Sequence, residues 1–298
     1  MNRGLWAAIA CYVMWGLLPL YWKALAHIPA HEILAHRMTW SLGFCLVVLA
    51  LSGQRTLWKQ LRAKPSMLGT YGFTALLLSI NWFVYIWATT HGHVLDASLG
   101  YFINPLFSVF LGVVVLHEKP RPLQWAAIGI ALVGVIWLTI IHGRVPVIAL
   151  ALAGSFGIYG LAKKRSELSS VQGLTLETAV LFVPAAAFLL FQDARGVGSF
   201  GHTSVQDGLL LAFSGVVTAL PLMFFAMAAR RIPLNQLGFL QFIAPILQFS
   251  LGIIAFGETL SSNRLVGYVV IWIALTIFVF DNIRGTKRYH RGKAHGVA

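Results

Sequence analysis

The sequence predicts an all-α integral membrane protein of ten transmembrane helices, arranged as two inverted five-helix repeats. Three observations predict this fold: an apolar composition, ten apolar runs of bilayer-spanning length, and motifs that recur about 140 residues apart. Apolar residues make up 58% of the 298 residues and charged residues only 10%, whereas a soluble domain carries about 25% charged residues. Most of the molecular surface is therefore expected to face lipid.

Ten runs of the chain are long and apolar enough to cross a hydrocarbon core, which takes roughly 17–25 residues of helix. The first run follows Arg3 closely and shows no small-residue cleavage site, so we expect it to remain as a transmembrane helix and not to be removed as a signal peptide. The links are short and contain basic residues and prolines, and none could hold a soluble domain. The ten runs are 5–26, 33–52, 68–90, 97–116, 123–141, 145–162, 173–191, 208–229, 234–256 and 265–283.

Lysine and arginine residues are unevenly distributed among the links. With the N-terminus in the cytoplasm, most of the 22 Lys and Arg residues fall on the inner side, notably in 53–66, 163–165, 230–231 and the tail. The positive-inside rule then places both termini in the cytoplasm. The same distribution explains the net charge of +13. Nucleic-acid binding is not expected, because the basic residues lie between apolar runs and not along one polar face.

Matches between the two halves of the chain indicate an internal duplication. The matched pairs are Pro105 with Pro245, Gly112 with Gly252 and Glu118 with Glu258 at an offset of 140, and Trp15-Gly16 with Phe156-Gly157 at an offset of 141. Because each unit has an odd number of helices, its two copies must enter the membrane from opposite sides. We therefore predict a first repeat over 1–143, a second over 144–284, and a basic cytoplasmic tail over 285–298.

Several segments carry a family resemblance. The repeated pattern of Gly, Pro-Leu and Leu-Gly with a Glu at the helix end resembles the EamA family of the drug/metabolite transporter superfamily. Segments 32–41 (EILAHRMTWS), 98–105 (SLGYFINP) and 271–275 (IWIAL) resemble the RarD-type permeases within it. The resemblance covers nearly the whole chain up to about Arg284. It implies a ten-helix carrier of the bacterial inner membrane with both termini inside, but it implies no particular substrate.

Charged side chains inside apolar runs are functional candidates by default, because a charge at the centre of a transmembrane helix costs about 2.5–3.5 kcal/mol. Arg37, Glu177 and Lys23 lie within or at the shoulder of such a run. We predict that Arg37 lines a substrate path and that Glu177 couples transport to protons. The repeat offset pairs these two positions across the halves. The alternative for both is a side chain near a helix end that reaches the headgroup region.

Uncharged polar and aromatic side chains extend the predicted path. Asn81 and Tyr85 are four residues apart and share a helix face, and a polar stripe must face protein or water. Pro105 and Pro245 are predicted hinges, because a proline removes a backbone hydrogen bond and kinks its helix. The full set of path candidates is Arg37, Asn81, Trp82, Tyr85, Tyr101, Asn104 and Gln241. The alternatives are hydrogen bonds between helices and simple packing kinks.

Other reactive residue types form no recognisable site. Cys11 and Cys45 lie in apolar runs and are expected to pack as small hydrophobes. His27, His31 and His36 are spread over a link and the start of the next helix, so we expect no metal site there. We expect no catalytic residue, no metal site and no cofactor.

Together these features predict an inner-membrane secondary transporter that moves a small organic metabolite or drug by alternating access. Its partners would be the small-molecule substrate and the lipid bilayer, and a homodimer stays possible. The alternative is a non-transporting membrane sensor or assembly partner with the same fold. Phosphorylated substrates are disfavoured, because they would need several basic side chains at mid-membrane depth and only Arg37 approaches that.

Overall fold

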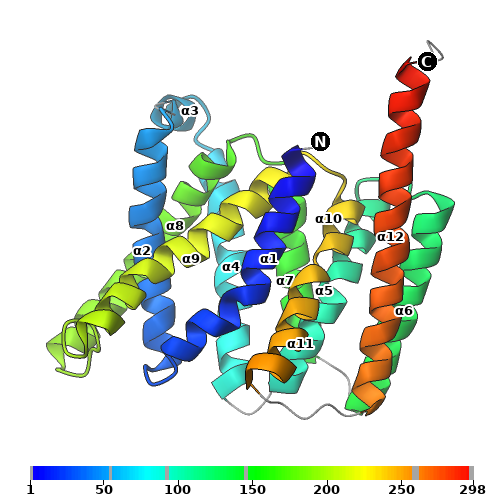
Figure 1. The fold of residues 1–298 in the computed structure, drawn as a ribbon. Coiled ribbons are helices and arrows are strands. Elements are labelled where there is room, and N and C mark those ends of the chain that lie inside the picture. Colours follow the sequence, from blue (N-terminus) through cyan, green and yellow to red (C-terminus); the bar gives the residue numbers. More distant parts are fainter. Residues whose placement is uncertain (1–2, 54–55, 91–93, 144–146, 257–261, 295–298) are drawn as a thin grey trace.

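The computed structural model describes residues 3–53, 56–90, 94–143, 147–256 and 262–294, and within these ranges all regular structure is helical. The helices lie side by side in one bundle (Figure 1). They are α1 (Arg3–Ala24), α2 (Ala30–Leu51), α3 (Leu57–Ala63), α4 (Met67–Thr90), α5 (Val94–Val114), α6 (Pro122–His142), α7 (Val147–Lys164), α8 (Ser170–Ala194), α9 (Val205–Ala229), α10 (Leu234–Leu240), α11 (Ile243–Phe256) and α12 (Ser262–Ala294).

The surface of the bundle is suited to lipid. Among the described residues, seven helices are long and apolar enough to cross a membrane, and Leu99–Val114 and Leu265–Asp281 are shorter apolar stretches. Large apolar side chains point outward, such as Ile140, Val183 and Leu190, which are 69%, 67% and 71% exposed. Exposure of this kind is costly in water but favourable against acyl chains. The prediction of an all-helical membrane protein is confirmed.

Each predicted apolar run coincides with helical structure, but the predicted link 53–66 also contains a helix, α3. Leu57 and Leu61 lie one turn apart on α3 and are both buried in a cluster with Tyr71 and Leu168. This pair of leucines attaches the link to the start of α4 and to the link between α7 and α8. A window sized for a membrane span overlooks a helix of seven residues.

The predicted run 234–256 is divided into α10 and α11. The break lies at Gln241 and Phe242, just before Pro245. Proline has no N–H to bond the carbonyl of Gln241 four residues earlier, and that carbonyl instead accepts from the N–H of Ala244 at 3.2 Å. Pro105, the predicted counterpart of Pro245, lies inside the unbroken helix α5.

Helix α12 continues well beyond the end of its apolar run. It extends to Ala294, so the boundary predicted near residue 285 marks a change in hydropathy and not the end of the helix. Five of the eleven residues from 284 to 294 are Arg or Lys, which are good helix formers. Residues 295–298 of the predicted tail and the repeat residue Glu258 lie outside the described residues.

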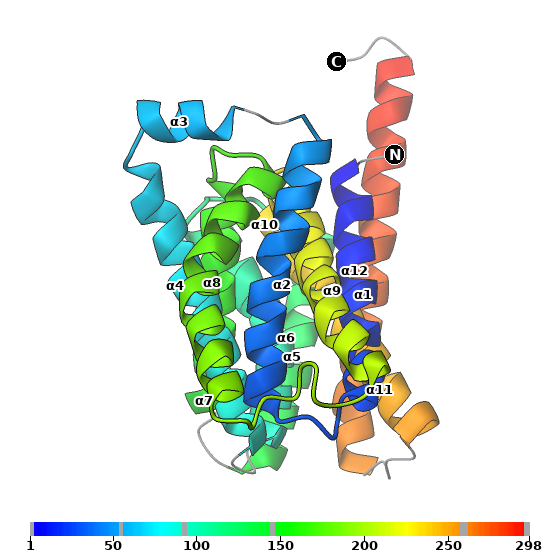
Figure 2. The same ribbon diagram turned by 90° about the vertical axis from the view of Figure 1, so that its left-hand side faces the viewer.

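The bundle has a paired edge, a central group and an opposite edge. α6 contacts α12 at one edge (Figure 1), and α2 lies at the other with α8 and α9 on either side of it (Figure 2). Between them, α1, α7, α9 and α10 share one buried cluster that includes Tyr12, Tyr159, Phe225 and Leu237. This central group positions the walls of the cavity described next.

Candidate functional site

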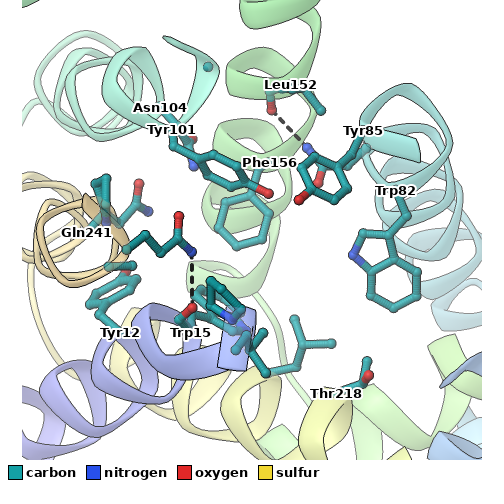
Figure 3. Close-up of a pocket in the computed structure, with 18 of the residues that line it drawn as sticks. Tyr12, Trp15, Trp82, Tyr85, Tyr101, Asn104, Leu152, Phe156, Thr218 and Gln241 are labelled. Carbon is teal, nitrogen blue, oxygen red and sulfur yellow. Dashed lines mark hydrogen bonds between the residues drawn. The ribbon is translucent and has the colours of Figure 1, made fainter. Parts of the chain in front are cut away.

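A cavity of about 180 Å³ lies at the centre of the bundle. Its walls come from α1, α2, α4, α5, α7, α9 and α11, together with Gln241 at the break before α11. Figure 3 shows the labelled side chains converging on this space from different helices. The walls combine aromatic rings with amides and hydroxyls, and Arg37 is the charged residue among the described lining residues.

All the predicted substrate-path residues line this cavity. The structure brings together Arg37, Asn81, Trp82, Tyr85, Tyr101, Asn104 and Gln241, and the predicted hinge Pro245 lies beside them. Glu177 and Pro105 are not among the lining residues. Residues from runs as far apart as the second and the ninth therefore share one space.

Arg37 is held by a close approach of α2 and α9. A Cβ on Gly215 would overlap the backbone carbonyl of Trp40 and lie 2.6 Å from the Cβ of that residue, so glycine is needed where these helices meet. Thr218 is one turn further along α9 on the same face, and its Oγ1 accepts a hydrogen bond from Arg37 Nε at 3.0 Å. The guanidinium also lies over the rings of Trp22 and Trp82, at 4.6 and 5.2 Å from the ring centroids.

Amide side chains connect the helices around the cavity. Asn81 Nδ2 donates to the carbonyl of Leu152 at 2.9 Å and to Ser155 Oγ at 3.0 Å, which ties α4 to α7. Gln248 Nε2 donates to the carbonyl of Trp15 at 3.1 Å, which ties α11 to α1. Asn104 Oδ1 is buried, and among the described residues it has no hydrogen-bond partner. It is an acceptor that a bound molecule could satisfy.

Several aromatic residues of the cavity wall were not predicted from the sequence, because rings in apolar runs resemble ordinary core or interfacial residues. They are Tyr12, Trp15, Trp22 and Phe156. One signal could have found two of them: Trp15 and Phe156 are matched at the offset of 141. In the structure their rings meet edge to face, with centroids 5.5 Å apart. The repeat therefore places matched aromatics on facing walls.

Glu177 lies in a separate, closed polar cluster. Its side chain is fully buried and its Oε1 lies 2.6 Å from Lys163 Nζ, which is also buried. Thr74 donates to the same oxygen, and Tyr159 donates to Oε2 at 3.2 Å. Arg37, the residue paired with Glu177 by the repeat offset, bonds instead to Thr218.

From the sequence Lys163 was placed in the link after the sixth run, whereas the structure places it in the last turn of α7. The apolar run ends at residue 162, but α7 continues through Lys164, and Lys163 turns inward. A Cβ on Gly173 would lie 3.3 Å from Lys163 Nζ, so this glycine of α8 leaves room for the ammonium group. Side-chain direction at a helix end cannot be read from hydropathy.

The cavity and the Glu177 cluster take residues from opposite halves of α4 and of α7. The cavity takes Tyr85 from the C-terminal half of α4 and Leu152 from the N-terminal half of α7. The cluster takes Thr74 from the start of α4 and Lys163 from the end of α7. The bundle is therefore closed by a buried ion pair at one end and hollow towards the other.

A second depression, of about 490 Å³, is strongly basic. Its charged lining residues are Glu118, Lys119, Arg121, Lys164, Arg230 and Arg231. Glu118 accepts from the backbone N–H groups of Leu234 and Asn235 at 2.6 and 2.8 Å and so caps the start of α10. A carboxylate is favourable at a helix N-terminus because free N–H groups point towards it.

The three histidines near the start of α2 have separate environments. His27 Nε2 lies 3.1 Å from Asp207, and His36 Nε2 lies 3.9 Å from Glu32. His31 contacts the ring of Phe188. Within the described ranges no group of three or more His, Cys, Asp or Glu residues is arranged to hold a metal ion.

Comparisons with known proteins point in one direction. The EamA-like transporter family matches residues 2–140. The chain is 46% identical to protein RarD of Streptomyces exfoliatus, covering 96% of this chain and 91% of that protein. It is 45% identical to the uncharacterised transporter YojE of Bacillus subtilis, covering 95% of both. A solved crystal structure with 18% identity overlays with a TM-score of 0.70, covering 93% of this chain and 97% of that one, which shows a shared fold.

The similarities to the two relatives and to the solved structure extend over nearly the whole chain and agree with its apolar helices. They identify a multi-pass protein of the bacterial inner membrane that is a permease and not an enzyme. The predicted resemblance to the RarD-type permeases of the EamA family is thereby confirmed. The chain belongs to the EamA-like transporter family and, within it, to the RarD-type permeases.

Proposed function

We propose that this protein is a secondary carrier that moves a small organic metabolite or drug across the inner membrane by alternating access through the central cavity. The observation that carries the proposal is the cavity itself, on which polar and aromatic side chains from both halves of the chain converge. Carriers built from repeats bind their substrates where the halves meet. The predicted path residues would contact the substrate there.

The proposal includes ten membrane crossings as two inverted repeats, with α10 and α11 together forming the ninth crossing. Exchange of the halves pairs α1 with α7, α2 with α8, α4 with α9, α5 with α10–α11, and α6 with α12. If the halves are equivalent, each contact between two helices should have a counterpart between their two matched helices. The counterpart of α5–α7 is α11–α1, that of α2–α9 is α8–α4, and that of α1–α9 is α7–α4. All of these contacts are present. This regularity supports a pseudo-two-fold relation between the halves.

We also propose that both termini are cytoplasmic. Lys64 pairs with Glu167, and Gln172 Nε2 donates to Thr56 Oγ1 at 3.2 Å, so the link with α3 touches the link after α7. The basic links before α6 and after α9, together with Lys164 at the end of α7, line one depression. The N-terminus, the C-terminus and α3 lie at one end of the bundle (Figure 1). Basic links gathered at one end support a cytoplasmic location for that end.

In this mechanism the Glu177 cluster closes the cytoplasmic side. Opening that side would require α4, α7 and α8 to separate where Thr74, Lys163 and Glu177 now meet. Protonation of Glu177 would weaken its ion pair with Lys163, because a neutral carboxyl no longer attracts the ammonium group. We therefore propose that proton binding at Glu177 is coupled to opening, with Pro105 and Pro245 as hinges.

A transport screen can test the proposed function before any substrate is identified. Vesicles containing the wild-type chain are incubated with a small-molecule extract of bacterial cells, and their contents are measured by mass spectrometry. At least one organic compound should be enriched over protein-free vesicles. Ala244→Phe, which places a ring in the cavity, should abolish that enrichment. Ile140→Phe on the lipid-facing surface should retain it.

The alternative of a non-transporting sensor or assembly partner makes the opposite prediction. Vesicles with the wild-type chain would then contain no more of any compound from the extract than protein-free vesicles do. Enrichment that survives Ala244→Phe unchanged would place the transport path outside the cavity.

A further inference from the structure

The cavity carries one positive charge. Among its described lining residues Arg37 is the cation, and none is Asp or Glu. Within the described part of the chain, Arg37 forms no ion pair with a carboxylate; the buried Glu177 is taken by Lys163. The other polar lining groups are amides and hydroxyls, which carry no net charge.

The guanidinium is held in place with part of its hydrogen-bonding capacity unused. Its one hydrogen bond to a described residue runs from Nε to Thr218 Oγ1 at 3.0 Å. The rings of Trp22 and Trp82 hold it from the side, at 4.6 and 5.2 Å. Both terminal nitrogens therefore remain available to donate. Paired N–H groups of this kind match the two oxygens of a carboxylate.

Charge balance then limits the substrate. A cavity that closes around Arg37 alone would bury an unpaired cation, which is costly. A monoanion would neutralise it, a cation would add a second positive charge, and a dianion would leave a net negative charge. Closure during alternating access is therefore most favourable around a singly charged anion.

The walls and the volume describe the rest of the molecule. Trp15, Trp82, Tyr85, Tyr101 and Phe156 present rings to the cavity, as Figure 3 shows. Aromatic rings favour stacked or edge-to-face contact with another ring. A cavity of about 180 Å³ has room for a substrate with one aromatic ring, because an engineered cavity of about 150 Å³ binds benzene.

We propose that the cavity binds a monoanionic carboxylic acid that bears one aromatic ring (an aryl acid), whose carboxylate is paired with Arg37 and whose ring lies among the aromatic walls. This inference rests on the proposed function, since it assigns a substrate class to the same cavity.

Three matched probes test the inference on the full-length chain in lipid nanodiscs: 3-phenylpropionate, 3-phenyl-1-propanol and 3-phenylpropylamine. They share a phenyl ring on a three-carbon chain and carry a negative, zero and positive charge. Binding is measured by isothermal titration calorimetry. The acid should bind at least about tenfold more tightly than the alcohol, since a hydrogen bond to a charged group contributes roughly one to two powers of ten in affinity. The amine should bind more weakly than the alcohol.

Variants locate the effect. Arg37→Gln should remove most of the preference for the acid over the alcohol, and Arg37→Lys should retain part of it, because lysine keeps the charge but loses the planar fork. Arg195→Gln, at an exposed cation after α8, should leave the preference unchanged. The comparison of acid with alcohol on the wild-type chain does not depend on the folding of any variant.

The outcomes separate the two proposals. If the alcohol or the amine binds as tightly as the acid, and Ala244→Phe abolishes that binding, the anion inference is wrong while the cavity remains the proposed site. If none of the three probes binds, the aryl-acid inference is overturned, and the extract screen judges the carrier function independently.

Discussion

At the scale of single residues, a buried ion pair joins Glu177 to Lys163. Both side chains are almost completely excluded from solvent, and the carboxylate also accepts from Thr74 and Tyr159. Removal of one partner leaves the other charged and buried, which costs more than the pair itself contributes. The pair therefore connects α4, α7 and α8 and holds one end of the bundle closed.

Lys163→Met or Glu177→Gln alone should lower the free energy of unfolding by about 3–5 kcal/mol, and the double variant should cost less than either single change. Glutamine keeps one acceptor oxygen and places an NH2 group at the other position, where the hydroxyl of Thr74 or Tyr159 can accept from it, so the double-mutant cycle mainly reports the charge pair. Thermal unfolding in detergent measures the effect. The exposed pair Lys64 and Glu167, with side chains 52% and 57% exposed, is the control, and its removal should cost less than about 1 kcal/mol. Additive effects in the buried pair would contradict this assignment.

The same Glu177→Gln variant tests proton coupling. If Glu177 is the coupling carboxylate, the variant should lose uphill transport driven by a proton gradient and keep downhill exchange of a compound found in the extract screen. Both modes are measured in the same vesicle preparation. Equal loss of both modes would point to a structural role for the pair.

At the scale of helices, close contact between α2 and α9 depends on Gly215. A Gly→Ala change in a helix normally stabilises it by about 1 kcal/mol, but a methyl group at 215 would overlap the backbone carbonyl of Trp40. Gly215→Ala should therefore lower the melting temperature, because the helices must move apart. Gly208→Ala is the matched control on α9, since nothing lies within 4 Å of its added Cβ. A melting temperature at or above that of the wild type for Gly215→Ala would refute the close contact.

The two prolines make a prediction about hinges. Pro245→Ala gives residue 245 an N–H that can bond the carbonyl of Gln241 and so join α10 to α11, whereas Pro105→Ala acts inside the continuous helix α5. Under alternating access the two changes should shift accessibility in opposite directions. Substrate affinity should change little for Pro105→Ala, because Pro105 does not line the cavity.

Single cysteines at the exposed positions Val114 and Ile254 can report these shifts. The background would have Ala at Cys11 and Cys45, which are both buried. A shift in the same direction for both proline variants would show that the prolines serve helix packing alone.

At the scale of the whole molecule, the orientation prediction depends on the basic links. A reporter fused after Ala298 should be active in the cytoplasm. A protease tag inserted after Gly201 should be cut from outside; this glycine lies between α8 and α9 with a φ of +80° and open space around it. A C-terminus on the outside would contradict the proposed cytoplasmic orientation, and termini on opposite sides would contradict the ten crossings.

Much of the candidate site was predictable because polar residues are costly inside apolar runs. Arg37, Asn81, Asn104 and Gln241 were identified on that ground, and all four line the cavity. Trp22 and Tyr12 could not be identified in the same way, because an aromatic ring in an apolar run is equally compatible with core, lipid or a cavity. Lys163 was not predicted, because hydropathy does not indicate whether a side chain at the end of a helix points into the protein or towards solvent.

The sequence by itself determined the class of molecule: a helical membrane protein, its apolar runs, and its membership of a transporter family. These properties depend on transfer free energies summed along the chain and on motifs local in sequence. Only the tertiary structure decided that Arg37 meets Thr218 and Trp82, that Lys163 neutralises Glu177, and that Glu118 caps α10. Each of these contacts joins separate segments of the bundle, so it depends on how closely their backbones approach and which way each side chain turns.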